Sequence, residues 1–156
     1  MVVQARRSSS LILALSLMLA AAMGAGAAVR DGQDTAARRS TRDGVYTDAQ
    51  ANRGEREFGR TCEHCHGAGL EGDSAREIPP LVADPFMRSW NGKSLKELFD
   101  VLSRSMPADN RGSLSARAYT DLIAYLLRAN GAPAGTSALS DAPGGLEAIV
   151  IEPSEN

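Results

Sequence analysis

The chain has 156 residues, of which 17 are basic and 19 acidic, so its formal net charge is −2 at pH 7. This length allows one domain with terminal tails. The slightly acidic balance argues against nucleic acid as a partner.

The N-terminus has the layout of a secretory signal peptide. Arg6 and Arg7 form a basic region, residues 11–22 a hydrophobic region, and residues 25–27 a small-residue cleavage site. We therefore expect residues 1–27 to be removed and the protein to be exported to the periplasm.

An uncleaved membrane anchor is the alternative for this N-terminus. Apolar and small residues continue over residues 11–29, about the minimum length for a span. We expect contact with a membrane only in that case. Residues 28–46 hold almost nothing to bury, so we expect a flexible lead before the domain.

The first helix is predicted to open at Thr47, because Thr47 and Gln50 have the spacing of a capping box. Gly54, Phe58 and Cys62 follow at steps of four and share one face of this helix. The glycine leaves room there for another backbone to pack closely.

The helix leads into the string Cys62-Glu63-His64-Cys65-His66, which has the pattern C-x-x-C-H. In an exported protein this pattern is the attachment signature of a c-type haem. Both thiols share one helical face and can add to one porphyrin edge, while His66 can bind the iron. Zinc, which needs about four well-spaced ligands, and a redox disulfide, which needs a βαβ frame, are weaker alternatives.

Residues 67–93 are predicted to be an irregular loop, because glycines and prolines recur along them. A loop of this length inside a compact domain is normally functional. We expect it to wrap the cofactor, with five apolar residues lining the porphyrin: Leu70, Ile78, Leu81, Val82 and Phe86.

Two further helices and a tail complete the chain. A capping box at Ser94 predicts a helix that ends before Pro107, and a third helix is predicted from about residue 115 to Asn130. Residues 134–156 form a C-terminal extension. Its apolar residues 149–151 are consistent with a short strand or an extended piece laid over the domain.

An iron that carries electrons without binding small molecules needs a sixth ligand. Beyond the signal region the sequence offers Met87 and Met106, and His64 is too close to His66 to reach the opposite haem face. Met106 lies in an irregular stretch where its thioether can turn toward the iron, whereas Met87 suits gap-filling in a core. We therefore expect Met106 as the sixth ligand.

These features resemble the class I c-type cytochromes over residues 47–133. Gly54 and Phe58 match the family's N-terminal helix, and residues 122–126 look like the C-terminal helix that crosses it. The resemblance implies an all-α fold, with three main helices and long loops wrapped around one covalent haem c.

The resemblance also implies roles for single residues. Pro79 is similar to a proline whose carbonyl accepts a hydrogen bond from the ligand histidine. Trp90 is similar to a tryptophan that hydrogen-bonds a haem propionate. Met106-Pro107 matches the axial methionine, so His66 and Met106 are the expected iron ligands, and no catalytic residue is expected.

The finer pattern from Pro79 to Asn130 is similar to cytochrome domains that accept electrons from periplasmic quinoprotein dehydrogenases. We expect a one-electron carrier, not itself an enzyme, that passes electrons to a terminal oxidase or another cytochrome. The alternative is a haem subunit with an open or displaceable sixth site, acting as a peroxidase-like protein or ligand sensor.

Overall fold

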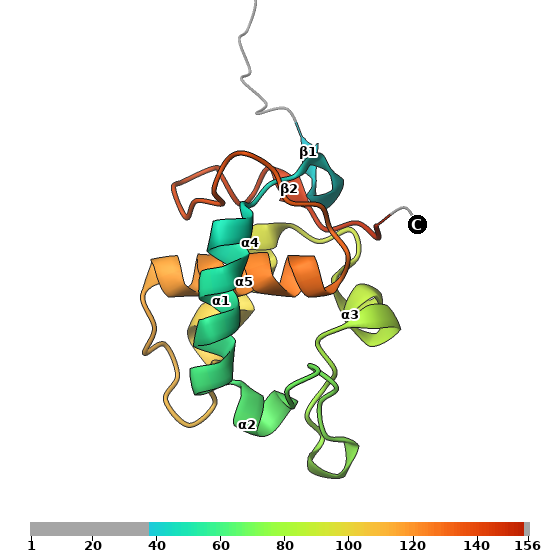
Figure 1. Cartoon of the computed structure of the whole chain (residues 1–156), viewed down its shortest axis with the longest axis vertical. Helices are drawn as coiled ribbons and strands as arrows, with labels where there is room; N and C mark the ends of the chain where they lie inside the picture. The colour runs from blue at the N-terminus through green and yellow to red at the C-terminus, as the bar shows by residue number, and fades with distance from the viewer. Residues whose placement is uncertain (1–37, 155–156) are drawn as a thin grey trace, which may run out of the picture. The chain divides into compact units, whose positions relative to one another are not determined.

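The computed structural model describes residues 38–154. In this range the fold is all-α, with one short strand pair and two single-turn 3₁₀ helices (Figure 1). The elements in chain order are β1 (Arg39–Ser40), η1 (Thr41–Asp43), α1 (Asp48–Thr61), α2 (Glu63–His66), η2 (Ser74–Arg76), α3 (Ala83–Trp90), α4 (Leu95–Ser105), α5 (Ala116–Ala129) and β2 (Ile149–Val150).

The three main helices begin where the sequence predicts. Thr47 caps α1, and Ser115 caps α5 through a hydrogen bond from a main-chain N–H to each side chain. At α4 the complete capping box forms between Ser94 and Glu97. At α1 the box is only half made, because the side chain of Gln50 instead bonds the main chain of Leu139.

Helix α1 crosses α5 in close contact (Figure 1). Gly54 makes this possible, since a Cβ at this position would overlap the main-chain carbonyl of Asp121. One turn further on, the rings of Phe58 and Tyr125 pack with centroids 5.4 Å apart. The close approach that the glycine predicts is therefore confirmed, and α5 is the partner.

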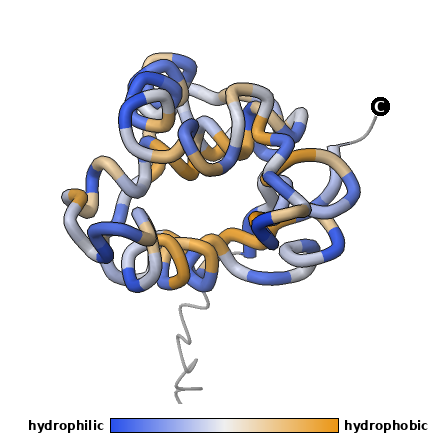
Figure 2. The backbone as a smooth tube through the Cα atoms, turned by 90° about the horizontal axis from the view of Figure 1, so that it is seen from below, coloured by the Kyte–Doolittle hydropathy of each residue, from blue (hydrophilic) through white to orange (hydrophobic). Residues whose placement is uncertain are grey.

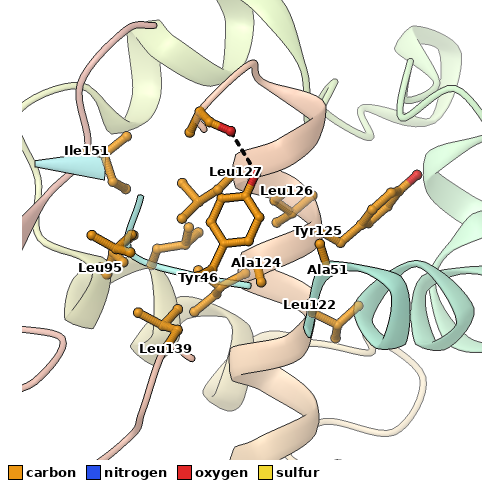
Figure 3. Close-up of a cluster of buried hydrophobic side chains, with 14 of the residues drawn as sticks. Tyr46, Ala51, Leu95, Leu122, Ala124, Tyr125, Leu126, Leu127, Leu139 and Ile151 are labelled. Carbon is orange, nitrogen blue, oxygen red and sulfur yellow. Dashed lines mark hydrogen bonds between the residues drawn. The ribbon is translucent and has the colours of Figure 1, made fainter. Parts of the chain in front are cut away.

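Two segments outside the helices complete the core. Tyr46 is 1% exposed and packs in the core cluster with side chains of α5, and its hydroxyl donates to the Ala132 carbonyl at 2.6 Å (Figure 3). The extension after residue 134 buries four apolar side chains in this core: Leu139, Leu146, Ile149 and Ile151.

The expected flexible lead differs from the structure over residues 39–46. Arg39 and Ser40 form β1, which pairs in parallel with β2, and Val45 is buried beside Tyr46. The strand expected near residues 149–151 is confirmed. Both segments are short, and hydrogen bonds join them, from the Arg39 N–H to the Ala148 carbonyl and between Thr41 and Glu152. Local composition does not reveal such contacts between distant parts of the chain. The expected signal peptide lies outside the described residues.

The loop between the haem motif and α4 is more regular than predicted, since residues 83–90 form α3. Pro85 lies in the first turn of α3, where its missing N–H costs no hydrogen bond. Within residues 38–154, the helices are all too short or too polar to cross a membrane.

Candidate haem-binding site

A cavity of about 380 Å³ lies among α1, α2, α3, α4, α5 and the segments that follow α2 and α4. The backbone segments around this cavity include hydrophobic stretches from several parts of the chain, coloured orange in Figure 2. Its walls are mostly apolar, and this volume is in the range of sites for small molecules and cofactors. Apolar residues of the wall include Phe58, Ile78, Leu81, Phe86, Leu98, Val101, Leu102, Leu114, Leu122 and Leu126.

All six site residues expected from the sequence line this one cavity. They come from five places in the chain: the turn after α1, helix α2, the loop after it, the end of α3 and the end of α4. The six are Cys62, Cys65, His66, Pro79, Trp90 and Met106.

Cys62 and Cys65 lie in a single turn of chain. Cys62 joins α1 to α2, and its carbonyl accepts from the N–H of Cys65 at 3.1 Å and of His66 at 2.9 Å. Both cysteines are free thiols and partly buried. Burial raises the pKa of the Cys62 thiol, while a contact with the Thr61 hydroxyl acts the other way. Two thiols therefore face one cavity from one helical turn.

His66 is 7% exposed, and its Nδ1 lies 3.3 Å from the carbonyl oxygen of Pro79. A carbonyl only accepts, so this hydrogen bond forms when Nδ1 carries the proton, which leaves Nε2 with a free lone pair. Burial lowers the pKa of His66; the Pro79 bond opposes this shift, and the charge of His64 adds to it. The imidazole is thus neutral at neutral pH, the form that binds metals.

Met106 directly follows α4. Its N–H donates to the Leu102 carbonyl at 3.0 Å, and its own carbonyl accepts from the Tyr119 hydroxyl at 2.8 Å and the Gly112 N–H at 3.3 Å. Met87 lies in α3, where it packs partly buried against the core outside the cavity lining. Of these two methionines, Met106 is the one at the cavity.

Trp90 ends α3 at the cavity wall. Its ring packs on Phe86 with centroids 6.4 Å apart, and the ammonium of Lys93 lies 5.0 Å from the ring centroid. A cation over the face of an indole is attracted by the ring electrons. The side chain is therefore held between α3 and the turn that leads into α4.

Part of the expected lining is different in the structure. Leu70 is buried in the core at φ +58°, and Val82 packs against that core. Neither residue lines the cavity. Tyr119 also lines the cavity, and the sequence analysis did not assign it to the site. A helical apolar stripe shows which face is buried, but it does not show whether a helix or a cofactor covers that face.

The side chains around the cavity fit a haem by their chemistry. They offer a neutral imidazole, a thioether, two thiols and a largely apolar wall. In residues 38–154, no three His, Cys, Asp or Glu side chains are grouped so that they could hold a metal ion together. The zinc alternative therefore has no ligand set in this range.

A family model described as "Cytochrome C oxidase, cbb3-type, subunit III" matches residues 49–126, which is half of the chain. The chain belongs to this family of c-type cytochromes. It is a class I c-type cytochrome, with a domain that binds haem c and transfers electrons. The matched residues of the cytochrome contain the C-x-x-C-H string, Met106 and most of α5.

Among solved structures, the cytochrome is similar to a chain in "Crystal Structure of the Sulfane Dehydrogenase SoxCD from Paracoccus pantotrophus". The two share 28% identity with a TM-score of 0.45, over 52% of this chain and 43% of that one. The similarity therefore spans less than half of the length of that chain. No curated protein matches the cytochrome.

Proposed function

We propose that this cytochrome is a periplasmic one-electron carrier with a single haem c, bound covalently through Cys62 and Cys65 and ligated by His66 and Met106. The observation that carries the proposal is the meeting of these four side chains at one apolar cavity, although Met106 lies about forty residues from the C-x-x-C-H string. The signal-peptide layout of residues 1–27 supports the proposed export.

Each side chain has a distinct task. When bound, the haem supplies the Fe(III)/Fe(II) couple. The thiols of Cys62 and Cys65 fix the porphyrin edge, and the Pro79 carbonyl holds the ring of His66 with Nε2 unprotonated. A thioether ligand and a dry wall both favour the reduced state, so they raise the reduction potential.

The proposed partners are other redox proteins. Electrons arrive from a periplasmic dehydrogenase and leave for a terminal oxidase or another cytochrome. The family description names an oxidase subunit, which supports an oxidase as acceptor. Contacts between such partners are small and transient, and the cytochrome acts as a carrier or as the electron-transfer subunit of a dehydrogenase.

The test is the optical spectrum of the purified protein, oxidised and reduced, compared with Met106→Ala and the control Met87→Ala. We expect a low-spin spectrum with a weak sulfur-to-iron charge-transfer band in the wild type and in Met87→Ala. The band should be lost in Met106→Ala. A high-spin wild type that binds carbon monoxide would contradict His/Met ligation and favour a sensor or a peroxidase-like protein.

A further inference from the structure

We propose that Tyr119 is a positioning residue for the sixth ligand. From α5, its hydroxyl holds the main chain of Met106 and thereby keeps the thioether at the iron. This inference rests on the proposed ligation by Met106 and adds the residue that maintains it.

The geometry of Tyr119 is well defined. The residue is 2% exposed, its hydroxyl donates to the Met106 carbonyl at 2.8 Å, and its ring lines the same cavity as Met106. The ring also meets Phe99 of α4 edge-on, with centroids 6.0 Å apart and planes at 77°. Packing therefore fixes the direction in which the hydroxyl points.

The other hydrogen bonds of Met106 are local. Its N–H bonds Leu102 in the last turn of α4, and its carbonyl also accepts from Gly112 within the same irregular stretch. Further bonds in this stretch run from Asn110 to Pro107 and from Ser113 to Asn110. Among the described residues, Tyr119 makes the hydrogen bond that ties the main chain of Met106 to another helix.

The hydrogen bond from Tyr119 to Met106 connects the methionine stretch to the helix pair that also carries the haem-attachment turn. Helix α5 carries Tyr119 at its N-terminal end and crosses α1 at the contact of Gly54 with Asp121. Helix α1 leads directly into Cys62. The haem-attachment turn and the Met106 stretch are thus both fixed to the α1–α5 pair, and the Tyr119 hydroxyl is the connection on the methionine side.

Without the Tyr119 hydroxyl, the thioether of Met106 should be dissociated from the iron for a larger fraction of the time. A buried neutral hydrogen bond changes an equilibrium by about two- to tenfold. The ferric protein binds an external ligand only after Met106 has left the iron. Tyr119→Phe should therefore bind added imidazole about two to ten times more tightly than the wild type.

Tyr46→Phe is the matched control. Tyr46 is also a buried tyrosine, and its hydroxyl donates to the main-chain carbonyl of Ala132 at 2.6 Å (Figure 3). It is not among the residues that line the cavity. Both variants should lower the melting temperature. Only Tyr119→Phe should raise the affinity for imidazole and weaken the charge-transfer band.

The outcomes separate this inference from the proposed function. If the wild type has the charge-transfer band, Met106→Ala removes it, and Tyr119→Phe binds imidazole like the wild type, the role of Tyr119 is wrong while the ligation stands. An equal rise in imidazole affinity in Tyr46→Phe would also overturn the role of Tyr119. If Met106→Ala leaves the spectrum unchanged, the ligation fails, and the role of Tyr119 fails with it.

A second variant covers the case in which Tyr119→Phe does not accumulate. Phe99→Leu keeps the hydroxyl but removes the ring that fixes Tyr119 edge-on. We expect a rise in imidazole affinity over the wild type that is smaller than the upper value of about tenfold given for Tyr119→Phe, again without a change in Tyr46→Phe. An affinity equal to that of the wild type would overturn the role.

Discussion

Gly54 lets the main chain of α1 lie against that of α5. A Cβ at this position would meet the carbonyl oxygen and carbon of Asp121, which belong to the backbone and cannot rotate away. The side chain of Asp121 also holds α1 and α5 together. The guanidinium of Arg53 donates two hydrogen bonds to its carboxylate, at 2.7 and 2.8 Å. One residue without a side chain therefore sets the distance between the two helices that frame the cavity.

Gly54→Ala should destabilise the holoprotein by about 1–3 kcal/mol, because the two helices must move apart to accept the methyl group. The measurement is the free energy of unfolding by chemical denaturation. The control is Gly59→Ala, also in α1, where a Cβ would meet only the end of the Glu63 side chain. That change should be neutral or stabilise by about 0.5–1 kcal/mol, since alanine favours helix more than glycine does. Equal losses in both variants would contradict the role given to Gly54.

Among the elements, the C-terminal extension is fixed to the helices by a small set of contacts. Gln50 of α1 exchanges two hydrogen bonds with the main chain of Leu139, at 2.9 and 2.7 Å, and is itself 2% exposed. Further along, Ile151 exchanges main-chain hydrogen bonds with Gly92 and Lys93, which join α3 to α4. The extension is therefore part of the folded domain over residues 139–151.

Gln50→Ala should destabilise the protein by about 2–4 kcal/mol, because it leaves a buried N–H and a buried carbonyl of Leu139 without partners. Limited proteolysis should then cut the extension first. Asn52→Ala is the control, since this exposed amide on the same helix accepts only from Arg128, and its effect should stay within about 0.5 kcal/mol. Similar proteolysis of the two variants would argue against the role of Gln50 in holding the extension.

The start of α4 should make stability depend on pH. Hydrogen bonds from the Ser94 N–H and hydroxyl hold the pKa of Glu97 below its ordinary value. The unfolded chain lacks these bonds, so the carboxylate stabilises the fold fully above its ordinary pKa, and this contribution is lost as the pH falls through the lowered pKa.

The Glu97→Gln variant has a neutral amide at this position, which does not ionise. The difference in melting temperature between wild type and Glu97→Gln should therefore be constant near neutral pH and shrink toward acid pH. In a Ser94→Ala background one donor to Glu97 is missing, so the same difference should vary less with pH. A difference that grows on acidification would contradict the assignment.

At the scale of the whole molecule, the buried apolar side chains form one cluster that includes Tyr46. Part of this cluster, from several helices, also lines the cavity. A flat apolar group bound there would pack against these side chains. We therefore expect the bound cofactor to contribute directly to folding stability.

Covalent attachment should add to this contribution. In the double variant Cys62→Ala, Cys65→Ala, we expect acid–acetone to extract all of the haem, and the melting temperature to fall because the cofactor can dissociate. Each single variant should retain its haem on extraction, through the remaining thioether bond. Extraction of haem from the wild type would contradict covalent attachment.

The sequence by itself determined the features that depend on neighbours along the chain. Caps at Thr47, Ser94 and Ser115 act within one turn, so the starts of the main helices were predictable. The C-x-x-C-H string likewise places its thiols and imidazole within one helical turn, and Met106 remained as the candidate sixth ligand because so few alternatives exist. Short-range hydrogen bonding and spacing carry this information.

Only the tertiary structure decided which distant segments meet. It placed the hydroxyl of Tyr46 at the carbonyl of Ala132, moved Gln50 from its expected cap to Leu139, and brought the hydroxyl of Tyr119 to Met106. It also formed α3 in a stretch that glycine and proline made irregular in the prediction. The reason is physical: these contacts join residues that are separated along the chain, and their free energy comes from burial and shared hydrogen bonds that no local pattern encodes.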